Sequence, residues 1–342
     1  MKYRTLGNTG LMVSELCMGT MTFGGEGLFK IIGALGQQDA NALVDKALEA
    51  GINFFDTADS YALHQSEQIL GKALGSRRKD VIVATKVRFR VDDNVNAVGL
   101  TRHHIFNQVE KSLQSLQTDY IDLYQIHAED PVTPLEETLR ALHDLVEQGK
   151  VRYIGYSNLP AWKAMKALGI SRQHGWNEFK SAQVYYSIGG RDLERDTVPM
   201  ALDQNIAILP WSPLAGGFLS GKFTRENQSA EGSRRTDFDF PPIDKEKAYD
   251  IVDVLKEIAD SKEVSIPQVA LAWLLHKPGV TSVIIGAKKM GQLEDNLKSV
   301  DIVLSEEEMN KLDEVSQLSP EYPGWFYSSP SDRMPGEKSW AQ

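Results

Sequence analysis

Short apolar runs rich in β-branched residues recur along the chain, with amphipathic stretches between them. Such alternation is typical of β-α-β units that build a parallel sheet. Buried strands are predicted at Leu16–Gly19, Phe54–Thr57, Val81–Lys86, Ile121–His127, Val151–Ser157, Ala182–Tyr185, Ala207–Trp211 and Val283–Ile285. The pattern therefore predicts an α/β fold around eight parallel strands.

The segments between these runs carry apolar residues at spacings of three and four, which predicts helices that cover the sheet. Leu139, Leu142 and Val146, for example, share one helix face. The predicted helices are Ala40–Ala50, Gln65–Leu74, Ile105–Leu116, Leu135–Gln148, Met200–Gln204, one around Ile251–Ile258 and one after Pro267. Eight strands, each followed by a helix, predict a closed (β/α)₈ TIM barrel with one core.

Two long segments interrupt this alternation and predict extended loops. Phe23–Gln38 holds five glycines and follows the first predicted strand, and Leu214–Asp244 follows the seventh. Both fall on the C-terminal face of the predicted barrel, where loops carry function. We expect a single domain over residues 1–342, with an N-terminal β-hairpin ahead of the barrel.

The tail, from about residue 319 to 342, is rich in proline and aromatic side chains. Two interpretations stay open: a frayed polar terminus, or a flap that covers the mouth of the barrel. Phe29, Trp325 and Phe326 would supply the apolar side chains of such a lid.

Composition excludes several classes of protein. Of the 342 residues, 42% are hydrophobic, enough for a large core, and 37 Lys and Arg against 47 Asp and Glu give a net charge of −10. An acidic surface disfavours nucleic-acid binding. Cys17 lies in an apolar run, which predicts an inert buried thiol. No apolar leader or stretch of 18 apolar residues occurs, so a cytoplasmic protein is expected.

Titratable residues end three neighbouring predicted strands. Asp56, Lys86 and His127 end the second, third and fourth strands, and Tyr61 follows Asp56 by five residues in the same loop. Each alone has an ordinary structural explanation, such as a helix cap or a hydrogen-bonded histidine. Their shared position predicts a proton-transfer set, because the C-terminal strand ends of a barrel meet in one pocket.

The chemistry of this set suits carbonyl reduction. A buried Asp56–Lys86 pair would keep the ammonium charged, and that charge is expected to lower the pKa of Tyr61 below about 10. Tyr61 could then protonate an oxygen that also receives a hydrogen bond from His127. No side chain donates hydride, so a nicotinamide cofactor is expected.

The sequence holds no Gly-x-Gly-x-x-Gly after a predicted strand, so a Rossmann domain is not expected to bind this cofactor. Gly216–Lys222 has the spacing of a phosphate-binding loop, but Phe223 occupies the position where Ser or Thr would bind magnesium, which disfavours NTP hydrolysis. The backbone of this loop and Lys222 could still lie along a pyrophosphate. Trp211 is either a core aromatic or a residue that stacks on the nicotinamide.

Four stretches resemble the aldo-keto reductase family, and the likeness covers nearly the whole chain. They are Gly51–Tyr61, Thr85–Lys86, Asp122–His127 and Lys150–Asn158. The resemblance implies a (β/α)₈ barrel with NADPH extended across its C-terminal face. It also implies that Asp56, Tyr61, Lys86 and His127 form the family's catalytic tetrad. The insertions and tail resemble bacterial members, and those related to potassium-channel β-subunits, more than the mammalian aldose reductase branch.

The resemblance further implies a set of cofactor contacts. These are Ser157, Asn158 and Gln183 for the carboxamide, Trp211 for the nicotinamide ring, Ser212, Leu214 and Gly216 for the pyrophosphate, and Gly286, Lys288, Gln292, Asp295 and Asn296 for the 2′-phosphate and adenine. Gln292 stands where the family often places an arginine, which would pair bidentately with phosphate. Lys288 and Lys289 could supply that charge, so NADPH is expected and NADH stays an alternative.

The resulting hypothesis is an NADPH-dependent oxidoreductase that reduces aldehydes or ketones reversibly, with Tyr61 as general acid. Two alternatives stay open: a catalytically slow NADPH-binding regulatory subunit, and an aldolase with Lys86 as Schiff-base nucleophile, which a charged Asp56 would oppose. The expected partner is a small-molecule carbonyl substrate, and a bulky, apolar one. No metal, nucleic acid or membrane is expected as a partner, and monomer and homo-oligomer both stay open.

Overall fold

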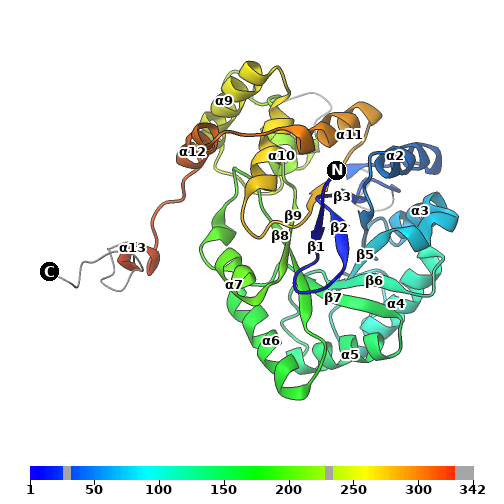
Figure 1. Ribbon diagram of the computed structural model, residues 1–342. Coiled ribbons are helices and arrows are strands. Elements are labelled where there is room, and N and C mark those ends of the chain that lie inside the picture. Colours follow the sequence, from blue (N-terminus) through cyan, green and yellow to red (C-terminus); the bar gives the residue numbers. More distant parts are fainter. Residues whose placement is uncertain (26–31, 228–233, 328–342) are drawn as a thin grey trace.

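The computed structural model describes residues 1–25, 32–227 and 234–327. Within them, eight parallel strands form one sheet in the order β10-β3-β4-β5-β6-β7-β8-β9 (Figure 1). The strands are β3 (Leu16–Gly19), β4 (Phe54–Asp56), β5 (Ile82–Val87), β6 (Ile121–Ile126), β7 (Val151–Ser157), β8 (Phe179–Tyr185), β9 (Ala207–Trp211) and β10 (Val283–Ile285). Every predicted strand is present, and the largest difference in boundary is at the start of β8.

The two edges of this sheet meet, so the sheet curls into a nearly closed barrel. The backbone N–H of Ile208 on β9 donates to the carbonyl of Gly279 (3.1 Å), and the N–H of Thr281 donates to the carbonyl of Ile208 (2.9 Å). These bonds join β9 to the segment that leads into β10. The architecture is the (β/α)₈ barrel that the strand pattern predicted.

Helices surround the barrel (Figure 1). They are α2 (Gln37–Glu49), α3 (Gln65–Leu74), α4 (Arg102–Leu116), α5 (Leu135–Glu147), α6 (Ala161–His174), α7 (Thr197–Gln204), α9 (Lys245–Lys262), α10 (Ile266–His276), α11 (Met290–Leu297) and α12 (Glu306–Val315), with the short α8 (Arg234–Asp237) and α13 (Gly324–Tyr327). In the part of the chain that the structure describes, no helix is long and apolar enough to cross a bilayer.

Helix α6 was absent from the predicted helices, because its apolar positions give a weak pattern. Its buried face includes Ala161, Ala164 and Ala167, and its large apolar residue Trp162 is exposed. Small residues on the inner face let the helix approach the sheet closely, but they carry little hydrophobic periodicity.

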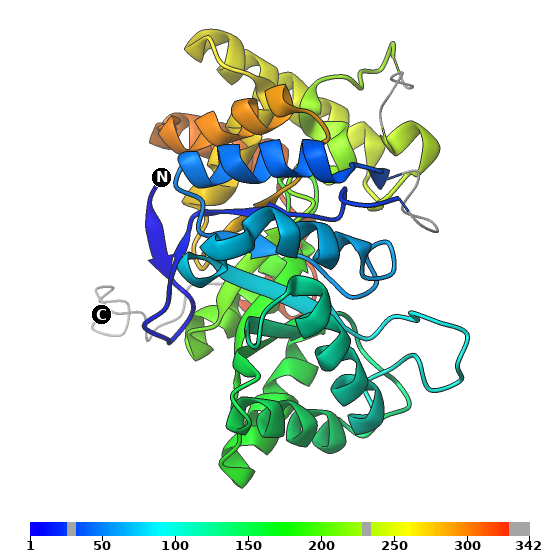
Figure 2. The same ribbon diagram turned by 90° about the vertical axis from the view of Figure 1, so that its right-hand side faces the viewer.

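An antiparallel hairpin of β1 (Tyr3–Thr5) and β2 (Met12–Ser14) closes the N-terminal end of the barrel. Leu6 and Val13 of this hairpin are fully buried and pack with Cys17 in the barrel interior. Cys17 is a buried free cysteine, as predicted, and burial raises the pKa of its thiol well above the usual value, which disfavours the reactive thiolate. Figure 2 shows the hairpin at one end of the barrel and long loops projecting from the other.

The alternation of side chains along each strand brings polar groups into the barrel near its C-terminal end. Ala84 of β5 and Leu123 of β6 belong to the interior apolar cluster. Two residues further along these strands come Lys86 and Gln125, which pair directly in the sheet register. Since a strand repeats every two residues, these polar side chains face the same interior as the apolar ones.

A second and larger apolar core lies between the strands and the helices. Phe55 of β4 and Tyr124 of β6 belong to it, next in sequence to residues that face the barrel interior. Both faces of each strand are therefore buried. This burial explains why the strands read as continuous apolar runs rather than as alternating ones.

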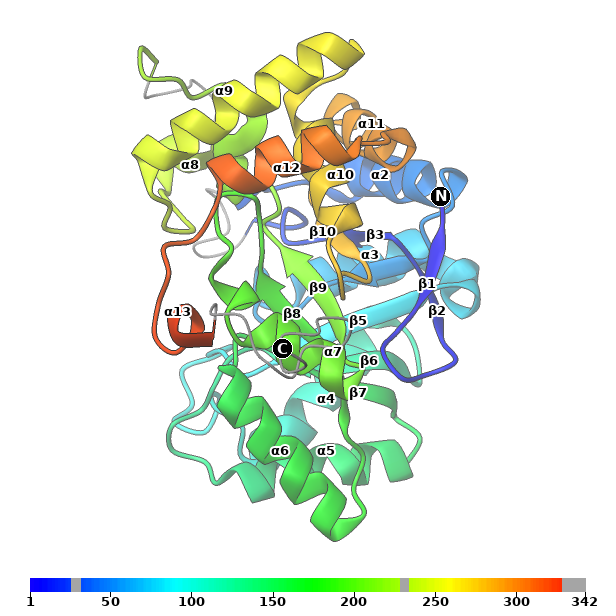
Figure 3. The same ribbon diagram turned by 60° about the vertical axis from the view of Figure 1, so that its left-hand side comes forward.

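The described part of the tail ends in α13, at the end of an extended stretch that leaves α12 (Figures 1 and 3). Glu321 forms an ion pair with Arg195 at 3.0 Å. Trp325 and Phe326 are 53% and 64% exposed. Phe29 and residues 328–342 lie outside the described residues, so the proposed lid over the barrel mouth stays a prediction.

Candidate active site

Lys86 is the centre of the predicted tetrad. Its Nζ lies 2.5 Å from Oδ1 of Asp56 and 3.2 Å from Oη of Tyr61, and it also donates to the backbone carbonyl of Thr57 at 2.7 Å. Lys86 is fully buried and Asp56 nearly so. The structure therefore brings together three of the four residues that the strand ends predicted.

The charge of Lys86 is fixed by this arrangement. Burial by itself lowers the pKa of Lys86, but the Asp56 carboxylate and the Tyr61 hydroxyl outweigh that effect, and the pKa is raised above the ordinary lysine value. Lys86 thus remains an ammonium ion at neutral pH. A protonated amine is not nucleophilic, so this geometry opposes the Schiff-base alternative.

Two glutamines support Asp56 from the neighbouring strands. Nε2 of Gln183 donates to Oδ2 of Asp56 at 2.8 Å, and Nε2 of Gln125 lies 3.3 Å from the same atom. Gln183 was predicted as a cofactor contact, whereas Gln125 was missed. The signal for Gln125 was available, because it lies two residues before His127 and so shares its strand face. Gly155 makes room for it, since a Cβ there would lie 3.2 Å from Cγ of Gln125.

The pKa expected for Tyr61 was wrong in direction. Burial raises the pKa of Tyr61 above its ordinary value of about 10, and the Lys86 charge offsets only part of this effect while Asp56 adds to it. The sequence argument counted the nearby ammonium but not the loss of water around the phenol. Tyr61 is therefore fully protonated at neutral pH, the state that a proton donor requires.

His127 lies beside the phenol of Tyr61. Their ring centroids are 5.6 Å apart, and the Phe89 ring also packs against His127 in a T-shaped arrangement, with centroids 4.7 Å apart. Burial, together with the charges of Lys86 and Arg88, holds the pKa of His127 well below its usual range. The imidazole is thus neutral, and its buried Nδ1 finds no hydrogen-bond partner among the described residues.

Asn158 forms hydrogen bonds with residues at the ends of β6, β7 and β9, close to His127. Its Nδ2 donates to the carbonyl of His127 at 3.0 Å and to Oγ of Ser157 at 2.8 Å, while its Oδ1 accepts from Nε1 of Trp211 at 3.1 Å. The Phe240 ring stacks on the indole of Trp211, with centroids 5.8 Å apart and planes 10° apart. Three of the predicted nicotinamide contacts therefore lie together, and Trp211 is only half-buried.

The loop after β9 folds back on itself. The N–H of Gly216 donates to Oγ of Ser212 and the N–H of Gly217 to the carbonyl of Leu214, both at 2.9 Å. These two N–H groups are therefore used within the loop. Lys222 is exposed, and Phe223 is a core residue.

The N-terminus of α11 carries another predicted part of the cofactor site. Oε1 of Gln292 accepts hydrogen bonds from the backbone N–H groups of Lys288 (2.8 Å) and Lys289 (3.2 Å). Gln292 thereby fixes the turn on which both lysines sit. An arginine at this position could not accept these bonds, so the departure from the family pattern has a local structural role.

Two further predicted residues of α11 are engaged by their neighbours. The carboxylate of Asp295 accepts from Oγ of Ser265 at 2.7 Å and from Nε2 of Gln268 at 2.6 Å. Nδ2 of Asn296 lies 3.5 Å from the carbonyl of Gly286. These contacts anchor α11 to α10 and to the end of β10.

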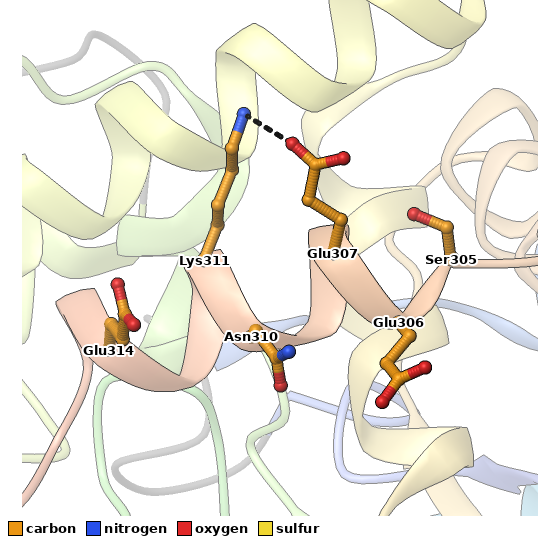
Figure 4. A pocket seen from close by; sticks show the side chains of 6 residues that line it. All are labelled: Ser305, Glu306, Glu307, Asn310, Lys311 and Glu314. Atoms are coloured by element: carbon orange, nitrogen blue, oxygen red, sulfur yellow. Dashed lines mark ion pairs between the residues drawn. The ribbon is translucent and has the colours of Figure 1, made fainter.

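A surface hollow also lies along α12 (Figure 4). It is lined by Ser305, Glu306, Glu307, Asn310, Lys311 and Glu314. Lys311 pairs with Glu307 at 3.8 Å on the same helix. This charged helix face contains none of the residues predicted from the strand ends.

Comparison with known proteins identifies the family of the chain. The Aldo/keto reductase family model matches residues 15–317. The chain is 35% identical to a versiconal hemiacetal acetate reductase of Aspergillus parasiticus, over 95% of this chain and 99% of that protein. It is 37% identical to the oxidoreductase YrpG of Bacillus subtilis (92% and 96% covered) and 35% identical to a probable voltage-gated potassium channel subunit beta of Oryza sativa (94% and 98% covered). The chain belongs to the aldo/keto reductase family, and is an oxidoreductase that acts on carbonyl groups.

Proposed function

We propose that this protein reduces aldehydes or ketones to alcohols with NADPH, reversibly, and that Tyr61 is the general acid. The observation that carries the proposal is one buried ammonium, Lys86, in contact with both Asp56 and Tyr61. In this arrangement the charge that stabilises a phenolate is already in place beside the phenol.

The residues divide the proton chemistry between them. Tyr61 gives its proton to the carbonyl oxygen as negative charge develops there, and the Lys86 ammonium at 3.2 Å stabilises the phenolate that results. Asp56 keeps Lys86 charged. The neutral imidazole of His127 donates a hydrogen bond that orients the same oxygen. A reduced nicotinamide, when bound, would supply the hydride for the carbonyl carbon.

The residues present fit a bound dinucleotide. Members of this family generally use NAD(P)H. Trp211 offers a flat indole whose Nε1 is fixed by Asn158 at 3.1 Å, suited to stacking with a planar ring. At Gly217 and Gly286 a Cβ would meet no atom within 4 Å, so the backbone is open to close approach there.

The choice of NADPH over NADH rests on charge near α11. Lys288 and Lys289 come from the turn that Gln292 fixes, and their side chains supply two positive charges for a 2′-phosphate. NADH lacks that phosphate and would gain nothing from these lysines.

The substrate that we propose is fairly large and apolar. Phe89 packs on His127, Phe240 stacks on Trp211, and Phe238 lies 5.5 Å from Phe240. All three rings are partly exposed, by 37% to 44%. Exposed aromatic rings beside the polar centre favour a flat apolar compound. The similarity to a reductase of versiconal hemiacetal acetate supports this choice.

The test compares wild type with Tyr61→Phe, measuring NADPH consumption with a panel of aldehydes and ketones. We expect kcat to fall by roughly 10²- to 10⁴-fold in the variant. Tyr124→Phe is the matched control, because Tyr124 is also buried but its hydroxyl has no hydrogen-bond partner in the described structure. Tryptophan fluorescence titration with NADPH confirms that each variant still binds the cofactor.

Three outcomes would contradict the proposal. Equal rates for wild type and Tyr61→Phe would remove Tyr61 from the reaction. Tight NADPH retention with negligible turnover of every carbonyl compound would indicate a regulatory subunit. Covalent trapping of a carbonyl substrate on Lys86 by borohydride would indicate Schiff-base chemistry instead.

A further inference from the structure

The turn that follows Tyr61 has an unusual backbone. Ala62, Leu63 and His64 have φ angles of 46°, 52° and 67°, so three successive residues with side chains adopt the left-handed conformation. Residues other than glycine rarely adopt it, because the Cβ crowds the following carbonyl oxygen. A turn of this kind persists only where surrounding contacts over-determine it.

The side chain of His64 supplies such contacts. Its Nδ1 lies 2.6 Å from Oε2 of Glu67, and its Nε2 lies 2.9 Å from Oε1 of Gln108 on α4. Glu67 and Gln108 are both buried. Since both partners are oxygen acceptors, both ring nitrogens donate, and the imidazolium form satisfies the site. The positive charge also compensates the buried carboxylate of Glu67.

Glu67 and the backbone of the turn make further hydrogen bonds, which connect the turn to the strand that carries Lys86. Oγ1 of Thr85 donates to Oε1 of Glu67 at 2.6 Å, and Thr85 is the neighbour of Lys86 in sequence. The backbone N–H of Asp59 donates to the carbonyl of Lys86 at 3.2 Å, and the N–H of His64 donates to the carbonyl of Asp59 at 2.8 Å. The segment that holds Tyr61 is thus joined to β5 on one side and, through His64, to α3 and α4 on the other.

We infer that His64 is a positioning residue, whose two side-chain contacts hold the left-handed turn so that Tyr61 stays opposite Lys86. His64 itself touches none of the reacting groups. The inference rests on the proposed function, in which the Oη of Tyr61 must meet the carbonyl oxygen.

The decisive variant is His64→Gly. Glycine adopts a φ of 67° without strain, so this change removes the two side-chain contacts while the turn itself remains allowed. Released from these contacts, Tyr61 should sample positions away from Lys86, and small displacements of a catalytic group cost up to about 10²-fold in rate. We expect kcat to fall about 10- to 100-fold, with an unchanged dissociation constant for NADPH.

A conservative variant separates positioning from general damage. In His64→Asn the side chain tolerates the left-handed conformation, and its amide can donate to Glu67. Because this variant keeps the Glu67 contact and loses only the Gln108 contact, we expect it to recover part of the kcat lost in the glycine variant. Gln108→Ala removes only the second contact and should give an intermediate kcat, while Gln114→Ala, an exposed glutamine on the same helix, should equal wild type.

His143→Ala provides a histidine control away from the site, because Nδ1 of His143 is 2.9 Å from Nδ2 of Asn177 at the other end of the barrel. It should lower the melting temperature without changing kcat. Wild-type kcat in folded His64→Gly, or equal kcat losses in the glycine and asparagine variants, would overturn the inference. If Tyr61→Phe were active, the proposed function would fail instead, so the two failures are distinguishable.

Discussion

The Nζ of Lys86 lies 2.5 Å from Oδ1 of Asp56, and both side chains are buried in the C-terminal half of the barrel interior. Removing two charges from water costs several kcal/mol for each ion, and their mutual attraction and hydrogen bonds offset that cost only when geometry is good. Asp56 accepts further hydrogen bonds from Gln183 and Gln125. The pair therefore affects the stability of the fold as well as the proposed reaction.

Replacing one member of this pair should destabilise the fold. In Asp56→Asn, the Lys86 ammonium remains buried without its counter-charge, and we expect the free energy of unfolding to fall by about 3–5 kcal/mol. The double variant Asp56→Asn/Lys86→Met should recover part of this loss, because it leaves no uncompensated charge. Urea unfolding of Asp56→Asn, Lys86→Met and the double variant measures the coupling energy between the two side chains. Additive losses would show that the two side chains do not interact energetically.

Acid stability should depend on His104 of α4. Burial lowers the pKa of His104 to about 4, and its Nε2 has no hydrogen-bond partner in the described part of the chain. As the pH falls below about 6.5, His104 binds a proton in the unfolded chain but stays neutral in the folded protein. The free energy of unfolding therefore decreases until the pH reaches about 4. His104→Gln should reduce this loss by about 2 kcal/mol between pH 7.5 and pH 5.

The neighbouring His103 provides the matched control, because it is exposed on the same helix. Urea unfolding at both pH values is the measurement. His103→Gln should keep the wild-type pH dependence of stability. If both glutamine variants lost as much stability in acid as wild type, His104 would not be the group responsible.

Cofactor preference should depend on the turn before α11. We expect the variant Lys288→Ala/Lys289→Ala to raise the KM for NADPH about tenfold and to leave the KM for NADH nearly unchanged, because only NADPH carries the 2′-phosphate. Lys298→Ala, an exposed lysine just beyond the other end of α11, is the control. The difference between wild type and variant should shrink at high salt, since salt screens exposed charges. Equal effects on both cofactors would exclude recognition of the phosphate.

The preference for large substrates should depend on Phe89 and Phe240, two aromatic rings in the loops that follow β5 and β9. In Phe89→Ala and Phe240→Ala, we expect kcat/KM for a polycyclic ketone to fall about tenfold, with little change for a short aldehyde, because only the larger compound contacts the lost rings. Tyr3→Ala, an exposed aromatic on the hairpin at the opposite end, should change neither value. A wild-type enzyme that showed no rise in kcat/KM from short to polycyclic compounds would contradict the proposed substrate class.

Much of the fold and part of the site could be predicted from the sequence. The barrel strands appeared as apolar runs because both of their faces are buried. Asp56 and Lys86 could be recognised because they interrupt such runs at one defined end, and parallel strands bring those ends together.

Other features depend on three-dimensional context that periodicity does not encode. The pKa of Tyr61 rises because neighbouring segments exclude water, and no local pattern reports that exclusion. The contacts of His64 join residues on two different helices, one of them 44 positions away in the sequence. Helix α6 was not predicted because most of its buried residues are small, with Leu168 as the one large apolar side chain among them.

The hairpin of β1 and β2 affects the direction from which reactants can approach the barrel interior. Leu6 and Val13 pack into the base of the barrel, so apolar side chains of the described residues fill the interior at that end. Under the proposed function, cofactor and carbonyl compound would therefore both approach from the C-terminal end of the strands, where Lys86 and Asp56 lie.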